Sequence, residues 1–588
     1  MNSPSVSSDP LPLPLVEDLL TDWLGARFAQ TFPGCPDAAS AGRVLPSTNP
    51  EFGDFQCNDA MGLAKALRTP PRAIAEKVVA GAALPGVVAR LEVAGPGFIN
   101  ISLESAFIAD RAIAIAADPH ACIPQSGAGR TVVLDYSSPN VAKPMHIGHI
   151  RSTIIGAAID QLHRALGYRV VADNHIGDWG TQFGIVIMGY RHFADPGKLA
   201  EEPTSELERV YVLSSRKSKE DEDWMEQCRA ELVKLQQGDP GNRALWKEFI
   251  RLSLKEFDRT YARLGVRFDL VRGESHYQDA LADVVDRLEA AGIAKESDGA
   301  TIVDLSSENL GVCIVRKRDG GFNYATTDIA TVESRVKEFD PEKIVYVTDE
   351  RQQLHFKQFF SVCRKLGVAP ESVDLVHVWF GLMRLPEGTF STRDGNVIKL
   401  DALLDEAEAR AMAIIRESRP ELPEDDAQTL AAQIGIGAVK YADLSQDPKT
   451  LITFTWDKAL ALEGNSGPYL QYAYARIRSV QEKYREQFPD TSPDAHPLDL
   501  ADPVERALGL KLALFPSVVQ KAALDYRPCL LADYLYDLAQ TYSSFYQRLP
   551  FLKADAGVRE SRIRLCGIVA TVLGRGLSLL GIATPERI

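Results

Sequence analysis

Two histidines stand three residues apart in the tetrapeptide His146-Ile-Gly-His149, which follows a polar loop. Residues at this spacing share one face of a helical turn. The free amides and the dipole of a helix N-terminus attract phosphate. The spacing therefore predicts a site that holds ATP by its phosphates. The tetrapeptide alone leaves an alternative open, namely a chance match in which His146 is an ordinary residue at a helix end.

The neighbouring segments supply the elements that would position these histidines. Upstream, Thr131–Asp135 is an apolar run that ends in a carboxylate, which is typical of a buried parallel strand. Downstream, apolar residues recur at helical spacing from His146 to Gly167. Pro144 fits a position before or early in that helix, because its missing N–H is no loss there. A strand, a loop and a helix start are the context that a phosphate site requires.

Composition bounds the class of protein. A chain of 588 residues, with 45% apolar and 25% charged residues, indicates a soluble protein of several domains. The net charge of −15 argues against a nucleic-acid partner only on average, since a local basic stripe can coexist with it. The eight cysteines are scattered, with no CxxC pair and no histidine cluster at metal spacing. We therefore expect no zinc, no disulfide framework and a cytoplasmic location.

The N-terminal residues Met1–Leu15 are rich in serine and proline and carry no basic residue. They resemble neither a signal peptide nor a mitochondrial presequence, and we expect residues 1–12 to form a disordered tail. Runs of about 20 uncharged apolar residues are missing, so we expect no membrane-spanning helix and no membrane partner.

The first of three blocks, residues 13–122, predicts a small α+β domain. Asn58–Leu67 has a helical pattern, and Ala94–Leu103 is strand-like. A turn-rich linker, Ile123–Gly129, follows.

The second block, residues 130–450, alternates apolar strands with helices, which predicts an α/β fold with a doubly wound, Rossmann-type parallel sheet. Ligands of such sheets lie beyond the carboxyl ends of the strands, where Asp135 falls. A charged helical insertion is predicted at about 201–263. Within it, Ser215–Asp223 indicates a solvated face or loop, or alternatively a nucleic-acid contact. Further strand candidates are Tyr168–Ala172, Lys343–Val347 and Val373–Trp379.

The third block, residues 454–588, predicts an all-α helical bundle. Apolar and tyrosine residues recur at helical spacing over Tyr469–Ile477 and again over Leu530–Phe545. We interpret the tyrosines as core or rim residues, with base stacking as the alternative.

The segment Ser137–His149, read as a whole, resembles the first class I motif of arginyl-tRNA synthetases. Further matches follow in order at Asp173–Gly184, Tyr324–Ile329 and Ala523–Arg527, so the resemblance covers nearly the whole chain. It implies an arginine–tRNA ligase, which activates L-arginine with ATP and transfers it to the terminal 2′-hydroxyl of tRNA(Arg). It also implies that the first block binds tRNA and that the third block is the anticodon-binding bundle.

Arginine is a planar cation with five donors, so a selective pocket needs carboxylates and oriented acceptors. A near-cognate amino acid would leave part of that set unpaired. The resemblance assigns guanidinium recognition to Tyr324, Asp328 and Gln352, and it places Ser138 and Asn140 nearer the α-amino and carboxylate end. It assigns Asp135 to either end.

Spacing alone leaves alternatives for two of these residues. Tyr324 and Asp328 are four apart and would share a helix face, next to which a ring adds a cation–π contribution. Asp328 could instead cap a helix that begins near Ile329. Gln353 competes with Gln352 because the two are adjacent.

For ATP, the resemblance implies contacts with a set of residues in which Lys143, His146 and His149 are catalytic. Magnesium is expected to arrive with ATP, without an all-protein cage. The ATP set comprises Lys143, His146, Gly148, His149, Gly381, Met383, Ser391 and Arg393.

The second class I motif, usually rich in lysine, is degenerate in this chain. Pro386–Asn396 stands in its place, with Thr389 and Thr392 at lysine positions and Arg393 as its cation. The resemblance directs attention to Lys143, just before the histidine motif, which could supply the missing point charge to the phosphates.

Transfer RNA binding follows mainly from the resemblance. It assigns Phe98 and Asn100 to reading a tRNA loop, and an aromatic face with an amide suits a splayed base. The alternative is that Phe98 packs in the core of the small domain. We expect a monomer.

Two competing functions remain at this stage. Another HxGH adenylyl-transferring enzyme is a poor match, because such chains are short and lack the helical third block. A catalytically silent tRNA-binding paralogue is opposed by the intact histidine motif but is favoured by the degenerate second motif.

Overall fold

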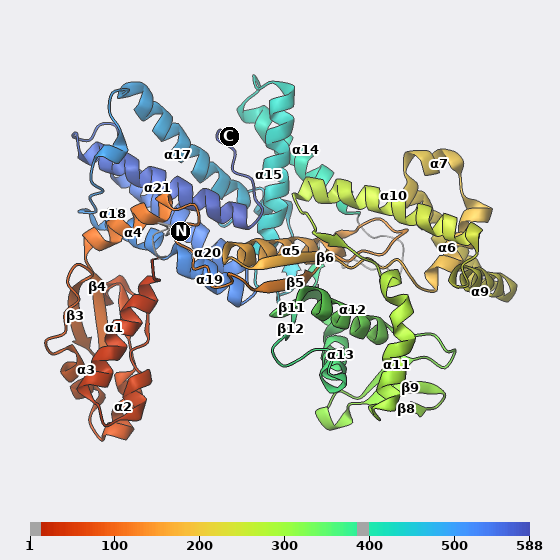
Figure 1. The fold of residues 1–588 in the computed structure, drawn as a ribbon. Helices are drawn as coiled ribbons and strands as arrows, with labels where there is room; N and C mark the ends of the chain where they lie inside the picture. The colour runs from red at the N-terminus through yellow and green to blue at the C-terminus, as the bar shows by residue number, and fades with distance from the viewer. Residues whose placement is uncertain (1–12, 385–398) are drawn as a thin grey trace, which may run out of the picture. The chain divides into compact units, whose positions relative to one another are not determined.

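The computed structural model describes residues 13–384 and 399–588, shown in Figure 1. The tail expected at 1–12 and the second-motif residues Ser391 and Arg393 lie outside these ranges. Two compact units make up the protein. The larger comprises Gly127–Pro468 and Leu579–Ala583, and the smaller comprises the residues up to Ser126, Tyr469–Ser578 and Thr584–Ile588.

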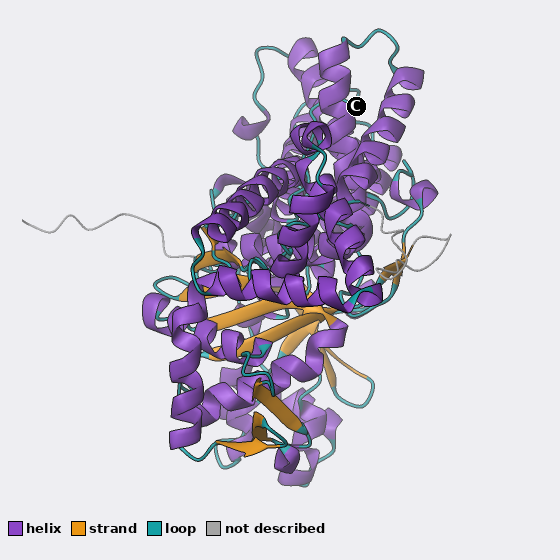
Figure 2. Ribbon diagram, turned by 90° about the vertical axis from the view of Figure 1, so that its right-hand side faces the viewer, coloured by secondary structure: helices purple, strands orange, loops and turns teal. Residues whose placement is uncertain are grey.

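A five-stranded parallel sheet forms the centre of the larger unit; strands are orange in Figure 2. Its order is β12-β11-β5-β6-β7, and every neighbouring pair is parallel. The chain fills the sheet outward from β5 on one side and from β11 on the other, so the topological switch point lies between these two strands. The strands are β5 (Thr131–Asp135), β6 (Arg169–Asn174), β7 (Leu270–Val271), β11 (Lys343–Asp349) and β12 (Asp374–Phe380).

Helices cover both faces of this sheet. Val133, Val171 and Ile344 pack in one core cluster with helices α11 (Leu281–Ala290), α12 (Tyr324–Phe339) and α13 (Gln353–Leu366). Helix α5 (Ile147–Ala165) packs on β5, β6 and β11 from the other face (Figure 1). Burial on both sides explains why β5 is a continuous apolar run, and the predicted doubly wound α/β fold is confirmed.

A group of helices lies between β6 and β7 in the chain, where a charged helical insertion is predicted. Asp221 Oδ1 accepts the backbone N–H of Trp224 at 3.1 Å and so caps the N-terminus of α9 (Glu222–Gln236). Ser215–Asp223 is thus a junction of two helices and not a loop. The helices are α6 (Gln182–Phe193), α7 (Pro196–Glu201), α8 (Pro203–Glu220), α9 (Glu222–Gln236) and α10 (Pro240–Leu264).

The larger unit contains further elements that the sequence did not predict. A three-stranded antiparallel sheet of order β10-β9-β8 precedes α12. Two long helices and a short parallel strand pair follow β12. These elements are β8 (Ala294–Ser297), β9 (Ala300–Asp304), β10 (Val312–Arg316), β13 (Met383–Arg384), α14 (Leu400–Ser418), α15 (Glu424–Leu444), β14 (Ile452–Thr453) and α16 (Trp456–Ala459).

The smaller unit begins with an antiparallel sheet of order β1-β2-β4-β3. The strand-like segment Ala94–Leu103 contains the whole of β4 and the turn before it, where Gly95 and Gly97 have φ of 50° and 140° and reverse the chain after β3. The elements are α1 (Val16–Thr31), β1 (Val44–Pro46), β2 (Phe55–Cys57), α2 (Ala60–Leu67), α3 (Pro71–Val79), β3 (Val88–Ala94), β4 (Phe98–Leu103) and α4 (Ser105–Ala117).

A helical bundle completes the smaller unit, as predicted. Helix α18 packs on α4, and Arg506 joins Asp54 of the N-terminal part through an ion pair of 2.7 Å. The helices are α17 (Gly467–Gln487), α18 (Pro503–Ala513), α19 (Phe515–Leu524), α20 (Cys529–Arg548) and α21 (Val558–Leu579).

One stretch of the described chain, Pro503–Leu524, reaches the length and apolar composition of a membrane span. Half of it is buried in the bundle. Core helices of proteins outside membranes meet the same criterion, so this stretch is weak support for a membrane span.

Candidate active site

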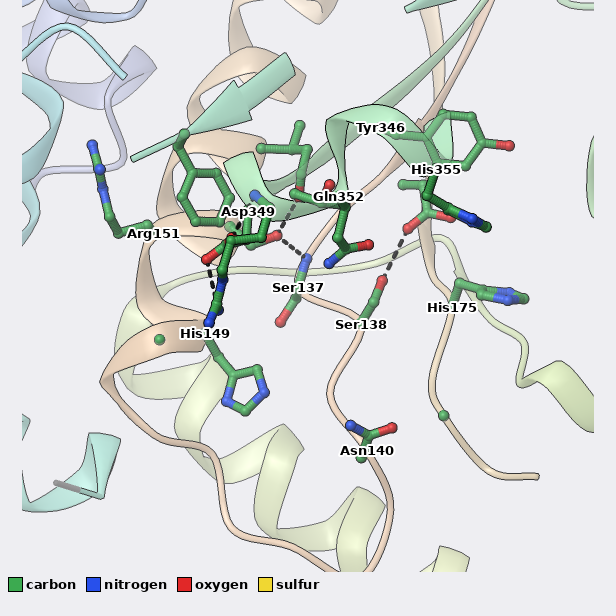
Figure 3. A pocket seen from close by; sticks show the side chains of 18 of the residues that line it. Ser137, Ser138, Asn140, His149, Arg151, His175, Tyr346, Asp349, Gln352 and His355 are labelled. Carbon is green, nitrogen blue, oxygen red and sulfur yellow. Dashed lines mark hydrogen bonds and ion pairs between the residues drawn. The ribbon is translucent and has the colours of Figure 1, made fainter. Parts of the chain in front are cut away.

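A cavity of about 890 Å³ opens at the switch point of the parallel sheet, within the larger unit. The carboxyl end of β5, the start of α5, the carboxyl end of β11 and the start of α12 all contribute to its lining. Figure 3 shows how Ser137, Ser138, Asn140 and His149 come together with Asp349, Gln352 and His355. Crevices of this size at switch points bind small ligands.

The two motif histidines begin α5 and hold each other in place. Nδ1 of His146 accepts the Gly148 N–H at 3.0 Å, and Nδ1 of His149 accepts the His146 N–H at 3.0 Å. A ring nitrogen that accepts carries no hydrogen, so in each neutral ring the proton lies on Nε2.

Both imidazoles are neutral at pH 7. Burial, and then the charge of Lys143, lower the pKa of His146. Burial, and then the neighbouring His146, lower the pKa of His149 to about 3. Two neutral Nε2–H donors at a helix N-terminus suit phosphate oxygens.

Asp135, at the end of β5, belongs to a buried ion-pair cluster. Arg335 of α12 donates to Asp135 Oδ2 at 2.7 Å and to Asp173 Oδ2 at 2.8 Å. The other carboxylate oxygen of Asp135 accepts the Ser138 hydroxyl at 2.9 Å. One arginine between two carboxylates leaves a net negative charge beside the cavity.

The loop after β5 has unusual backbone geometry. Ser137 and Ser138 have φ of 71° and 48°, a left-handed region that few residues other than glycine adopt. Ser137 is held there by its N–H on the Ser152 hydroxyl and by its own hydroxyl against Tyr261, each at 2.8 Å. This strain brings Ser138 to Asp135 and Asn140 to the cavity.

Two residues at the start of α12 face the cavity. The helix begins at Tyr324, with Asn323 before it, so Asp328 lies one turn inside the helix. The alternative in which Asp328 caps a helix near Ile329 is therefore wrong. Tyr324 is 68% exposed, as a residue at the rim of a cavity would be.

Partners on other elements surround Asp328. His355 Nε2 donates to Asp328 Oδ2 at 2.6 Å. Gln352 lines the same cavity, whereas Gln353 is the first residue of α13 and is absent from the described lining.

Glu274 adds a carboxylate from the segment after β7. Burial, then the charges of Asp328 and Asp178, raise its pKa to about 8. Such a perturbed carboxyl in a cleft is typical of a functional site, because a bound cation would restore its ionised form.

The cavity thus has two chemically different sets of groups. Carboxylates of Asp328 and Glu274, with Tyr324 and Gln352, suit a planar cation with many donors. The motif histidines suit a polyphosphate. A site of this kind can bring a cationic substrate and a nucleotide together.

Comparison with known proteins identifies the family. Residues 114–456 match the family described as tRNA synthetases class I (R), catalytic domain. Residues 21–103 match the arginyl tRNA synthetase N terminal domain, and residues 470–588 match the DALR anticodon binding domain. The arginine–tRNA ligase of Fusobacterium nucleatum is 46% identical over 92% of this chain and 94% of its own length. The chain belongs to the arginyl-tRNA synthetases.

Other arginyl-tRNA synthetases are similar along their whole length. The arginine–tRNA ligase of Chromobacterium violaceum is 43% identical over 97% of this chain and 99% of its own. The solved arginyl-tRNA synthetase of Thermus thermophilus has a TM-score of 0.80 and 26% identity, covering 98% of this chain and all of that one. That of Plasmodium falciparum has a TM-score of 0.82 with the same identity and coverage.

The structure brings together most of the residues that the sequence singled out. All residues predicted to bind arginine line the cavity, as do His146, Gly148, His149, Gly381 and Met383 from the ATP set. Lys143 is not among the described lining residues; its Nζ lies 4.6 Å from the centre of the Tyr211 ring on α8.

The two residues predicted to read tRNA lie on β4, in the smaller unit. Phe98 is partly buried, which leaves both the tRNA-reading role and the core-packing alternative as predictions. Asn100 is 5% exposed, and its side-chain oxygen accepts the Gln56 amide at 2.9 Å.

Sequence reasoning missed Glu274, His355 and Arg335. Each is a single charged or polar residue in an ordinary stretch, and each reaches the arginyl-tRNA synthetase site only through the fold. For metals, the described residues contain no cluster of three or more histidine, cysteine or acidic side chains that could hold an ion.

Proposed function

We propose that the cavity joins L-arginine to ATP, forming arginyl-adenylate and pyrophosphate, and that the arginine then passes to the terminal ribose 2′-hydroxyl of tRNA(Arg). As a member of the family, the protein is an ATP-dependent ligase. The observation that carries the proposal is the pairing, in one cavity, of carboxylates suited to a guanidinium with neutral histidines suited to phosphates.

In this proposal Asp328 and Glu274 bind the guanidinium, with Tyr324 and Gln352 completing its surroundings. Ser138, Asn140 and Asp135 receive the α-amino and carboxylate end. Orientation of the carboxylate towards the α-phosphorus, and donors for the charge that develops on oxygen, supply the catalysis.

His146 and His149 donate to the ATP phosphates, and Gly148, Gly381 and Met383 lie beside the nucleotide. Ser391 and Arg393 of the second motif contribute to ATP binding. Magnesium would come with ATP and would offset the negative charge of its phosphates. Lys143 supplies a cation where the second motif lacks lysine.

The proposal for Lys143 is tested by Lys143→Ala. We expect a loss of about tenfold or more in pyrophosphate exchange, since a charge-assisted hydrogen bond contributes about 1.5–3 kcal/mol. Unchanged exchange would exclude this role.

For tRNA, we propose that the domain at residues 13–122 binds it through Phe98 and Asn100, and that the bundle at 454–588 binds the anticodon. We propose a cytoplasmic monomer without a membrane partner.

Arginine-dependent pyrophosphate exchange into ATP tests the function directly. The assay is run with and without tRNA(Arg), with lysine as the control amino acid. We expect exchange with arginine and none with lysine. Failure to exchange under both conditions, with tRNA still bound, would instead identify a silent tRNA-binding protein.

A further inference from the structure

His355 contacts Asp328, whose carboxylate binds the guanidinium of arginine in the proposed function. Its Nε2 is 2.6 Å from Asp328 Oδ2, and both side chains line the cavity. An ionised carboxylate only accepts hydrogen bonds, so Nε2 carries the hydrogen whether the imidazole is neutral or protonated. His355 is therefore a donor to Asp328.

Packing holds the His355 ring in this orientation. The ring lies 5.2 Å from that of Phe359 and 5.7 Å from that of Phe356, both on α13. Phe359 is fully buried, and Phe356 stacks on His377 of β12 at 4.0 Å with an interplanar angle of 18°. Since its neighbours are fixed by the core, the imidazole is a rigid donor.

A rigid donor on one oxygen fixes the rotation of the Asp328 carboxylate before any ligand arrives. Oδ2 is engaged by His355, which leaves Oδ1 to accept from a guanidinium in the cavity. Preorganised groups bind more tightly because less conformational freedom is lost on binding. A lysine in this position would also donate, but its permanent charge would compete with the substrate cation for Asp328.

We propose that His355 is a positioning residue for arginine recognition, which orients Asp328 without supplying a permanent positive charge. The inference rests on the proposed function and deepens it. His355 acts through Asp328 and not on the reacting atoms, so its contribution falls on arginine binding and not on the chemical step.

Three substitutions at His355 separate the effects of its hydrogen-bond donor, its ring shape and its charge. His355→Gln keeps a donor near the Nε2 position, His355→Phe keeps a planar ring without a donor, and His355→Lys adds a permanent cation. Leu354→Ala is the matched control, since Leu354 is the preceding α13 residue, is 54% exposed and is absent from the described lining. Each variant is assayed by pyrophosphate exchange with tRNA(Arg) present.

For His355→Phe we expect the arginine KM to rise about tenfold, the value of one charge-assisted hydrogen bond. The ATP KM and kcat should stay within about twofold, because the histidine motif is untouched. His355→Gln should restore the arginine KM, His355→Lys should raise it further than the phenylalanine variant, and Leu354→Ala should match the wild type.

Two results would overturn the inference: an unchanged arginine KM in His355→Phe, or a glutamine variant as impaired as the phenylalanine variant. If His355→Phe does not fold, judged by circular dichroism, the comparison of the glutamine and lysine variants decides, and equal arginine KM values would reject the role. A wild-type protein that exchanges no pyrophosphate with arginine would reject the proposed function itself.

Discussion

At the scale of single residues, Glu274 couples arginine binding to a proton. Burial and the charges of Asp328 and Asp178 raise its pKa to about 8, so at pH 7 the empty site holds it largely protonated. A guanidinium favours the ionised carboxylate and lowers that pKa, so binding below about pH 8 releases a proton. We expect arginine affinity to rise with pH between about 6 and 8 and then to level off.

Calorimetry measures this release directly. The apparent enthalpy of arginine binding at pH 7 should differ between phosphate and Tris buffers, which have different ionisation enthalpies. Glu274→Gln should remove both the difference and the rise in affinity with pH. Equal enthalpies in the two buffers for the wild-type protein would contradict the prediction.

A second prediction at this scale concerns the contribution of Arg335 to stability. Arg335 is 1% exposed between Asp135 and Asp173, so Arg335→Met leaves two buried carboxylates without their cation. We expect a loss of about 3–5 kcal/mol in the free energy of unfolding of the larger unit. Urea denaturation followed by tryptophan fluorescence reports mainly on this unit, which contains Trp179, Trp224, Trp246, Trp379 and Trp456.

The matched control is Arg272→Met, which breaks a more exposed pair with Glu338 in the same unit. Exposed pairs contribute about 0–1 kcal/mol, so its unfolding curve should barely move. Equal losses of unfolding free energy in the two variants would show that the buried ion pairs of Arg335 contribute no more to stability than the more exposed pair of Arg272.

Some residues of the site belong to a local sequence motif, and others are brought to the site only by the fold. His146, His149 and Asp135 sit in one contiguous string, and Tyr324 and Asp328 share one helical turn, so the family resemblance could be matched to them in the sequence. Arg335 meets Asp135 across 200 residues of chain, and His355 meets Asp328 from another helix. No spacing or periodicity in the sequence indicates these contacts, because they form only when the chain folds.

At the scale of elements, Gly156 decides how closely α5 approaches the strand beneath it. A Cβ at this position would lie 2.3 Å from Cγ of the Tyr136 ring, which is 1% exposed. Glycine to alanine normally stabilises a helix interior by up to about 1 kcal/mol. Here we expect the opposite sign, a loss of about 1–3 kcal/mol from overpacking.

Gly62 in α2 is the natural comparison, because a Cβ there meets nothing within 4 Å. Gly62→Ala should raise the transition temperature of the smaller unit, while Gly156→Ala lowers that of the larger one. Scanning calorimetry on the full chain checks both. A stabilising Gly156→Ala would mean that α5 can move away from the sheet at little cost.

Elements with strong periodicity were predictable, and short ones were not. β5 ends where its apolar run ends, and β11, β12 and the bundle helices lie where their patterns indicated. The sheet β8–β10 was not predicted, because its strands have four or five residues and are partly exposed, so they show little hydrophobic periodicity. The strand-like segment Ala94–Leu103 contains β4, but β3 before it was not predicted, and the Gly-Pro-Gly turn was included in the predicted strand.

At the scale of the whole molecule, the chain returns late to the larger unit. After α21, Leu579–Ala583 belongs to the larger unit, where Leu580 and Ile582 are 2% and 3% exposed. Lys440 of α15 donates to the Gly581 carbonyl at 2.7 Å and to the carbonyl of Leu264, the last residue of α10. Lys440 therefore joins both the end of α10 and these five residues, which we call the strap, to α15.

A chain that ends at Ser578 tests the strap. We expect the larger unit to melt several degrees lower, because two buried apolar side chains and a buried hydrogen bond are lost. The control is a chain that ends at Ala583, which keeps the strap and loses residues of the smaller unit, namely the buried Pro585 and the ion pairs of Glu586 and Arg587. Equal melting of the two truncated chains would show that the strap contributes nothing.

The strap also sets an order of events during synthesis. Domains generally fold as units while the chain emerges, with N-terminal segments first. Here every strand of the catalytic sheet leaves the ribosome before Gly581, the later of the two carbonyl partners of Lys440, and all the bundle helices come between. Lys440 and Gly581 are 141 residues apart, so the catalytic unit of a nascent chain lacks this contact while all of the intervening residues are made.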